Sequence, residues 1–214
     1  MFVLPTSTKV DRVIPKNAFD NYADTKAKKL FVENVEKIKW LNKLSFDTVN
    51  LPGKEVKEIQ IFEISLRKFD PIPELVKIID KAIPYPILFV LTFEDHYQLN
   101  ISVKHPNPIN EDNAVIDWTF KTEWLPVGKE ACQFHLKQTI DYIFQDICIQ
   151  LSNTSNADRG LSLNEIVTKE QKLADLKNRI KKLESAIAKT KQFNKKVEFN
   201  LALQKLVLEL QGLG

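Results

Sequence analysis

The chain has 214 residues, a formal net charge of +3, 43% hydrophobic residues and 28% charged residues. These values are typical of one globular domain with an extension, or of two small units. The longest apolar run, residues 83–93, contains two prolines and is too short to span a bilayer. No basic segment followed by an apolar run opens the chain, so we expect no signal peptide and a cytoplasmic protein.

The first half of the chain alternates helical and strand patterns. Residues 1–16 show no periodicity, and residues 24–42 have the apolar spacing of an amphipathic helix. A short strand is expected near residues 47–51, and a longer one with two partly buried faces over residues 56–68. Residues 71–83 predict a short helix that Pro84 ends.

The second half of this region is rich in strands. Residues 86–93 form an apolar run that predicts a buried central strand, and residues 97–104 alternate like a half-exposed strand. A further strand is expected over residues 114–124, and residues 130–151 carry the clearest helical pattern. Cys132 and Cys148 would then lie on one helix roughly 24 Å apart, too far to form a disulfide.

These elements predict an α+β fold in three segments. The order α-β-β-α-β-β-β-α is typical of a mixed β-sheet with packed helices, and it places the core domain at residues 1–151. Residues 152–161 are polar without an apolar anchor, as in a linker. Residues 162–214 predict a C-terminal α-helical hairpin or coiled coil, which we call the arm.

The arm carries a heptad pattern. Ser162 and Glu165 have capping-box spacing, which predicts that a helix begins there. Apolar residues at the a and d positions then form a seam about three heptads long. The seam consists of Ile166, Leu173, Leu176, Ile180, Leu183 and Ile187.

Beyond Lys191 the arm is apolar on two faces. Phe199, Leu203, Leu206 and Leu210 form a new stripe, whereas Val197, Leu201 and Leu208 continue the seam. A helix that is apolar on two faces needs two neighbours. This favours a hairpin that bends near residues 192–194. One continuous helix of roughly 70 Å stays open as an alternative, because no glycine or proline lies between Leu161 and Gln211.

The arm also carries the positive excess of the chain. From Ser162 onward there are eleven Lys and Arg against six Asp and Glu, whereas residues 1–161 hold twenty basic and twenty-two acidic residues. The cluster near the bend predicts contact with nucleic-acid phosphates or an acidic partner surface, or simply a solvated helix face. It comprises Lys177, Arg179, Lys181, Lys182, Lys189, Lys191, Lys195 and Lys196.

No stretch forms a complete catalytic or cofactor motif. The histidines lack zinc-ligand spacing, and five glycines form no phosphate-binding loop, so we expect neither a metal site nor a cofactor. The one enzymatic alternative is a Mg²⁺-dependent nuclease of the restriction-endonuclease type, with Glu33, Asp47 and Glu63 as carboxylates. Ser65 stands where that class places its lysine.

Several stretches of the chain match a known family, and they are structural in character rather than catalytic. They are LPTST at 4–8, IPK at 14–16, FVE at 31–33, WxNKL at 40–44, FEI at 62–64, IDKAIP at 79–84, and KQFNKKVE at 191–198 with Asn200. On these stretches the chain resembles the bacterial domain-of-unknown-function family 4391 over nearly its whole length.

This resemblance implies a setting and carries over no catalytic residues. Members of the family are similar to proteins beside helicase and DNA-methyltransferase components of restriction-like anti-phage systems. The predicted function is therefore a non-enzymatic accessory or adaptor subunit in a DNA-linked system. Its arm would bind a protein partner, such as a helicase or methyltransferase component, or form a homodimer. Sequence-independent DNA binding by the arm is a further alternative.

Overall fold

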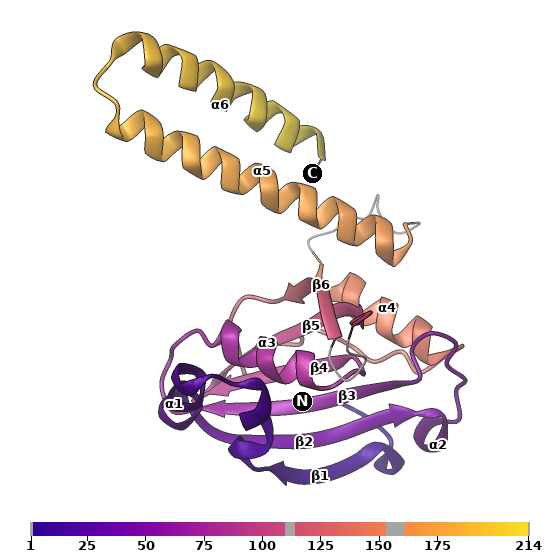
Figure 1. Cartoon of the computed structure of the whole chain (residues 1–214). Helices are drawn as coiled ribbons and strands as arrows, with labels where there is room; N and C mark the ends of the chain where they lie inside the picture. The colour runs from indigo at the N-terminus through magenta and orange to yellow at the C-terminus, as the bar shows by residue number, and fades with distance from the viewer. Residues whose placement is uncertain (1, 110–113, 153–160, 214) are drawn as a thin grey trace. The chain divides into compact units, whose positions relative to one another are not determined.

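The computed structural model describes residues 2–109, 114–152 and 161–213. The chain divides into two compact units, Met1–Leu151 and Ser152–Gly214, and each is described by itself. The first is an α+β domain around a mixed sheet, and the second contains two packed helices, which confirms the predicted fold class (Figure 1). The linker predicted at residues 152–161 lies almost entirely outside the described residues.

The sheet of the first unit follows the chain order β1-β2-β3-β4-β5-β6, and β7 pairs with β5 (Figure 1). Among the described strands, β3 and β4 are parallel and all other neighbours are antiparallel. The strands are β1 (Lys9–Ile14), β2 (Val35–Ser45), β3 (Glu58–Leu66), β4 (Ile87–Phe93), β5 (His96–Pro106), β6 (Ala114–Lys121) and β7 (Leu125–Pro126).

Local signals explain where the helices of this unit begin. The Asp24 carboxylate accepts the backbone N–H of Ala27 at 2.7 Å, which caps the helix that follows. Pro73 opens the crossover helix between β3 and β4, where its missing N–H is not needed. The helices are η1 (Thr6–Thr8), η2 (Lys16–Tyr22), α1 (Thr25–Asn34), α2 (Phe46–Val49), α3 (Pro73–Ala82) and α4 (Ile140–Leu151).

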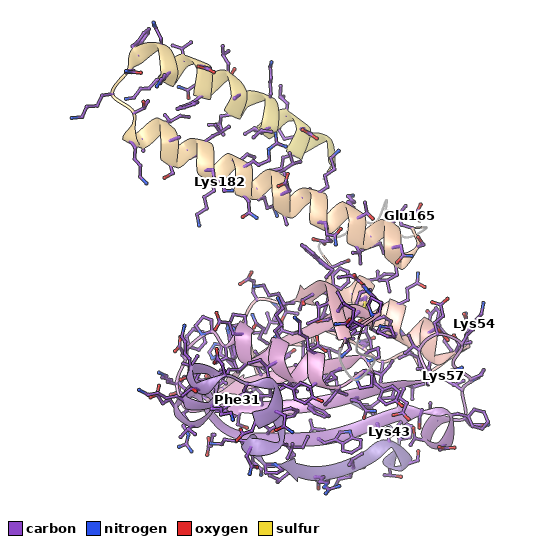
Figure 2. All side chains as sticks on the ribbon, viewed as in Figure 1. Phe31, Lys43, Lys54, Lys57, Glu165 and Lys182 are labelled. Atoms are coloured by element: carbon purple, nitrogen blue, oxygen red, sulfur yellow. The ribbon has the colours of Figure 1, made fainter. Side chains whose placement is uncertain are left out.

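A hydrophobic core joins α1 and α3 to one face of the sheet. Phe31 of α1, which is labelled in Figure 2, belongs to one buried cluster with Leu75 of α3 and with Phe62 and Phe89 of the central strands. The rings of Phe62 and Phe89 meet edge to face with centroids 6.2 Å apart. Such packing contributes beyond the apolar area that it buries, by about 0.5–1.5 kcal/mol.

A buried ion pair fixes the C-terminal end of α3 to β5. The Lys104 ammonium donates to the Asp80 carboxylate at 2.7 Å and to the backbone carbonyls of Asp80 at 2.6 Å and Ile83 at 2.7 Å. Both side chains are 1% exposed. The three donors of the ammonium are therefore all satisfied, as burial of a charge requires.

Asp141 at the start of α4 fixes the loop that precedes β3. Its carboxylate accepts the backbone N–H groups of Lys54, Glu55 and Val56 at 2.7–2.9 Å. Burial raises the pKa of Asp141, but these hydrogen bonds outweigh burial and hold the pKa below its usual value. Gly53 allows the tight turn, because a Cβ there would lie 2.1 Å from the Val56 carbonyl oxygen.

The sequence prediction is wrong around the second strand. The expected helix over residues 24–42 ends at Asn34, and residues 35–45 form β2 instead. Bulges in the β2–β3 pairing interrupt the two-residue alternation and space the apolar residues like those of a helix. The strand expected near residues 47–51 is the short helix α2, and the supposedly irregular N-terminal segment contains β1.

The long helix expected over residues 130–151 is also shorter than predicted. Gln138 has a left-handed backbone with φ 63°, and α4 begins at Ile140. Cys132 therefore lies outside the helix that holds Cys148, so the prediction that one helix carries both cysteines is wrong and the 24 Å spacing loses its basis. Both thiols are free and buried, and burial raises the pKa of Cys132 to about 12.

Candidate functional site

The arm consists of two helices, α5 (Leu163–Lys189) and α6 (Phe193–Leu213), that pack against each other (Figure 1). The predicted capping box begins α5: the Glu165 carboxylate accepts the backbone N–H of Ser162 at 2.8 Å. Hydrogen bonds from Ser162 also lower the pKa of Glu165. The predicted hairpin is confirmed, and the chain folds back over residues 190–192, slightly before the bend expected near residues 192–194, because α6 already begins at Phe193.

One face of each helix turns toward the other. Leu176 of α5 and Leu206 of α6 are buried, at 1% and 8% exposure. The Lys172 ammonium lies 3.4 Å from the Glu209 carboxylate and crosses from α5 to α6 near the same level. Leu206 belongs to the stripe of Phe199, Leu203 and Leu210, whose other members are half-buried.

The predicted seam residues all lie on α5. At 100° per residue they fall within an arc of roughly 100°, which is one helix face. Ile166 and Leu176 of this face are buried, the other four residues are half-buried, and α5 and α6 are in contact. The face therefore packs on α6, while its coiled-coil character stays a prediction. The six residues are Ile166, Leu173, Leu176, Ile180, Leu183 and Ile187.

The opposite side of α6 is apolar and exposed. Val197, Leu201 and Leu208 are 43%, 57% and 67% exposed, and we call these three residues the outward face. At 100° per residue they lie within about 40° of one another and about 160° from Leu206. α6 is thus apolar on two opposite sides, and α5 covers only one of them within the described chain.

The basic residues of the arm are placed on its surface. All eight are exposed, and Arg179 pairs with Asp175 at 3.6 Å. Figure 2 shows one of them, Lys182, on α5. Lys195 and Lys196 lie in the first turn of α6, which contains no acidic residue. Their positive charges lie at the positive end of the helix dipole, which is electrostatically unfavourable for the helix. The eight are Lys177, Arg179, Lys181, Lys182, Lys189, Lys191, Lys195 and Lys196.

The structure does not bring the nuclease carboxylates together. Glu33 lies near the end of α1, 3.7 Å from Lys29, and Asp47 lies in α2. The whole of β2 separates these two residues, a span of about 35 Å for an extended strand. Glu63 is half-buried in β3 opposite Lys39. The described ranges contain no group of three His, Cys, Asp or Glu residues suited to a metal.

A family model described as Domain of unknown function (DUF4391) matches residues 2–210. The chain belongs to this family. The restriction-like and anti-phage setting that the resemblance implied stays a prediction. No curated protein and no solved structure matches the chain. In the portion of this family member that the structure describes, no helix has both the length and the apolar character to cross a membrane.

Sequence reasoning found the second stripe of α6 but not its consequence. Val197, Leu201 and Leu208 were expected to continue the seam of α5, whereas they face away from α5. The signal was present, because the two stripes of α6 lie on opposite sides of an ideal helix. A helix of this kind requires a second neighbour besides α5.

Proposed function

We propose that the chain is a non-enzymatic accessory subunit whose arm associates with the arm of a second copy. The observation that supports this is the outward face of α6, three exposed apolar residues opposite the face that packs on α5. Two hairpins that meet through these faces would form a four-helix bundle, in which each α6 has two neighbours. The arm would then join two core domains that present the same surfaces to further partners.

The spacing of the outward face favours an antiparallel pair of α6 helices. Val197, Leu201, Gln204 and Leu208 follow one another at intervals of four, three and four residues, as the core positions of a coiled coil do. An antiparallel partner brings Val197 opposite Leu208 of the second copy. The same register brings Leu201 opposite Gln204 of the second copy, so every core position has a counterpart.

Charge complementarity supports the same orientation. Glu198 and Lys205 occupy equivalent flanking positions one heptad apart. In the antiparallel pair, Glu198 of each copy lies beside Lys205 of the other. A parallel pair would place Glu198 beside the uncharged Phe193 and Lys205 beside the uncharged Asn200. Because the apolar face is small, we expect a concentration-dependent dimer with a dissociation constant of roughly micromolar order.

Engineered disulfides test this geometry directly. In the double variant Val197→Cys, Leu208→Cys, each new thiol faces the other position of the second copy, so oxidation is expected to give a covalent dimer. Val197→Cys alone is expected to stay uncrosslinked, since its two copies lie about 16 Å apart along the helices. Non-reducing electrophoresis measures the yield, and the two native thiols are buried.

Each outcome of this crosslinking experiment bears on the proposal. Efficient crosslinking of the single variant Val197→Cys would indicate parallel helices and contradict the antiparallel pair. No covalent dimer from the double variant would contradict an interface on this face. The control is a pair of cysteines on α5, Asn178→Cys with Ser185→Cys. The proposal is supported if the double variant on α6 crosslinks at dilutions where this control gives no covalent dimer.

A second candidate function is binding to nucleic-acid backbone through the same arm. The observation that favours it is the first turn of α6, which places Lys195 and Lys196 at the positive end of the helix and contains no acidic residue. Such an arrangement is unfavourable for the isolated helix and favourable beside phosphate. The proposed setting, a DNA-linked system with a helicase or methyltransferase partner, is compatible with this contact.

Salt dependence distinguishes this contact from a solvated helix face. We expect the logarithm of the DNA association constant to fall steeply with the logarithm of salt concentration. The variant Lys195→Gln, Lys196→Gln should reduce that slope by about two, because two phosphate contacts are lost. The matched pair Lys26→Gln, Lys129→Gln removes two exposed lysines of the core domain. A flat salt response, or equal effects of both pairs, would contradict the proposal.

A further inference from the structure

A cavity of about 480 Å³ lies in the core domain between α3 and the strands β4, β5 and β6. Gln98, Asn100 and Ser102 of β5 line it, and these alternate residues share one side of the strand. The sequence predicted a half-exposed strand here, yet Asn100 and Ser102 are buried. The cavity therefore has a polar floor beneath a helix, and its volume suits a small organic ligand.

Asn100 offers the free amide of this floor. The residue is 6% exposed and, within the described chain, its side chain makes no hydrogen bond to protein. Its neighbours differ: Gln98 donates to the Thr122 carbonyl at 2.8 Å, and Ser102 shares a hydrogen bond of 2.9 Å with Thr119. The amide is not fully enclosed, since in the described chain the fully buried side-chain atoms without a partner belong to Asn34 and Gln60. Its donor and acceptor are therefore available to a ligand in the cavity.

Two tryptophans and two lysines complete the cavity. The indoles of Trp118 and Trp124 line it, and both are half-buried, so each offers a flat apolar surface. Lys77 of α3 and Lys121 of β6 line it as well and are exposed. In the ranges that the structure describes, neither lysine has a carboxylate within ion-pair distance. The cavity thus combines aromatic surface, one amide and two free cations.

We infer that this cavity binds an anionic planar heterocycle of the nucleotide class. The Asn100 amide offers one donor and one acceptor, which match the amide-like edge of a nucleobase. Stacking on an indole stabilises any flat nucleobase, whichever base it is, and the two lysines attract a phosphate. This inference concerns the core domain and is independent of association through the arm.

Tryptophan fluorescence of the full chain tests the inference. The third tryptophan, Trp40, lies on β2 outside the cavity lining, so a Trp40→Phe background leaves only the two cavity indoles as reporters. AMP, GMP, CMP and UMP are titrated separately, with the matching nucleosides and inorganic phosphate as comparisons. We expect at least one nucleotide to change the emission saturably, and its nucleoside to bind more weakly.

Two variants assign the binding to the cavity. Asn100→Leu is expected to weaken nucleotide binding by about tenfold or more while it keeps the melting temperature, because the Asn100 side chain makes no hydrogen bond to protein that the change would break. Lys121→Gln should weaken the nucleotide and leave the nucleoside unchanged, whereas Lys129→Gln, a control outside the cavity, should do neither. No saturable response to any nucleotide, or unchanged binding in both variants, would overturn the inference.

Discussion

Lys104→Met is expected to lower the free energy of unfolding by about 3–5 kcal/mol, the usual loss when one partner of a buried ion pair is removed. The ammonium satisfies the Asp80 carboxylate and two backbone carbonyls at the end of α3, all within 2.7 Å. Methionine keeps most of the volume but leaves Asp80 charged and buried at 1% exposure. Urea denaturation, with midpoint and slope compared, measures the loss.

The double variant Lys104→Met, Asp80→Leu separates the ion pair from packing. Replacement of both charges by apolar side chains removes the unpaired carboxylate, so we expect much of the lost stability to return. Two outcomes would show that the pair does not fix α3 to β5. One is a loss below about 1 kcal/mol for the single variant, and the other is an additive loss in the double variant.

Leu201→Lys is expected to weaken the association of two arms by about a hundredfold or more. Leu201 lies at the centre of the outward face and is 57% exposed in the single chain. By two-fold symmetry one substitution places two ammonium groups within the same interface, where they would have to be desolvated. That loss corresponds to roughly 3 kcal/mol, within the range of interface hot spots.

Matched variants separate this effect from charge in general. Asn178→Lys adds the same charge to the polar side of α5 and is expected to leave association unchanged. Glu198→Lys should weaken an antiparallel pair, and the added Lys205→Glu should restore it by reversing both ends of the pair. Association should be restored only if residues 198 and 205 of the two copies lie beside each other. Failure to restore association would therefore argue against the antiparallel register.

The core strands and the crossover helix could be predicted because their signals are local. Residues 87–93 form an apolar run that a buried central strand requires, and Pro73 marks the first turn of α3. The hairpin of the arm followed from the change of apolar phase after Lys191, since a single α5 face cannot bury both stripes of α6. The spacing of apolar residues was enough to predict an element wherever a single neighbouring element buries one of its faces.

The errors arose where tertiary structure overrode local pattern. A bulge in β2 between Val35 and Lys37 lets Val35 and Ile38, three residues apart, join the same buried cluster, and this spacing imitates a helix. Gln138 adopts a left-handed backbone that ends the apparent continuity of the 130–151 pattern. Alternation in β5 could not show that α3 covers Asn100 and Ser102, because burial of the polar side depends on a distant helix.

The carboxylates proposed for a nuclease show a related limit. Glu33 and Asp47 are fourteen residues apart in sequence, and a helix between them would have kept them closer than the extended β2 does. The error in the second strand therefore also removes the basis of that site. By contrast, the arm depends on no long-range pairing, and its residues were placed on the expected helices.

Sedimentation velocity of the full chain over a wide concentration range tests the central claim most directly. Association through the outward face of α6 predicts a monomer that converts to a species of twice its mass as concentration rises. Leu201→Lys should then remain monomeric over the same range, and Asn178→Lys should behave like the unaltered chain. A monomer at every concentration, or a dimer that Leu201→Lys leaves intact, would contradict the account.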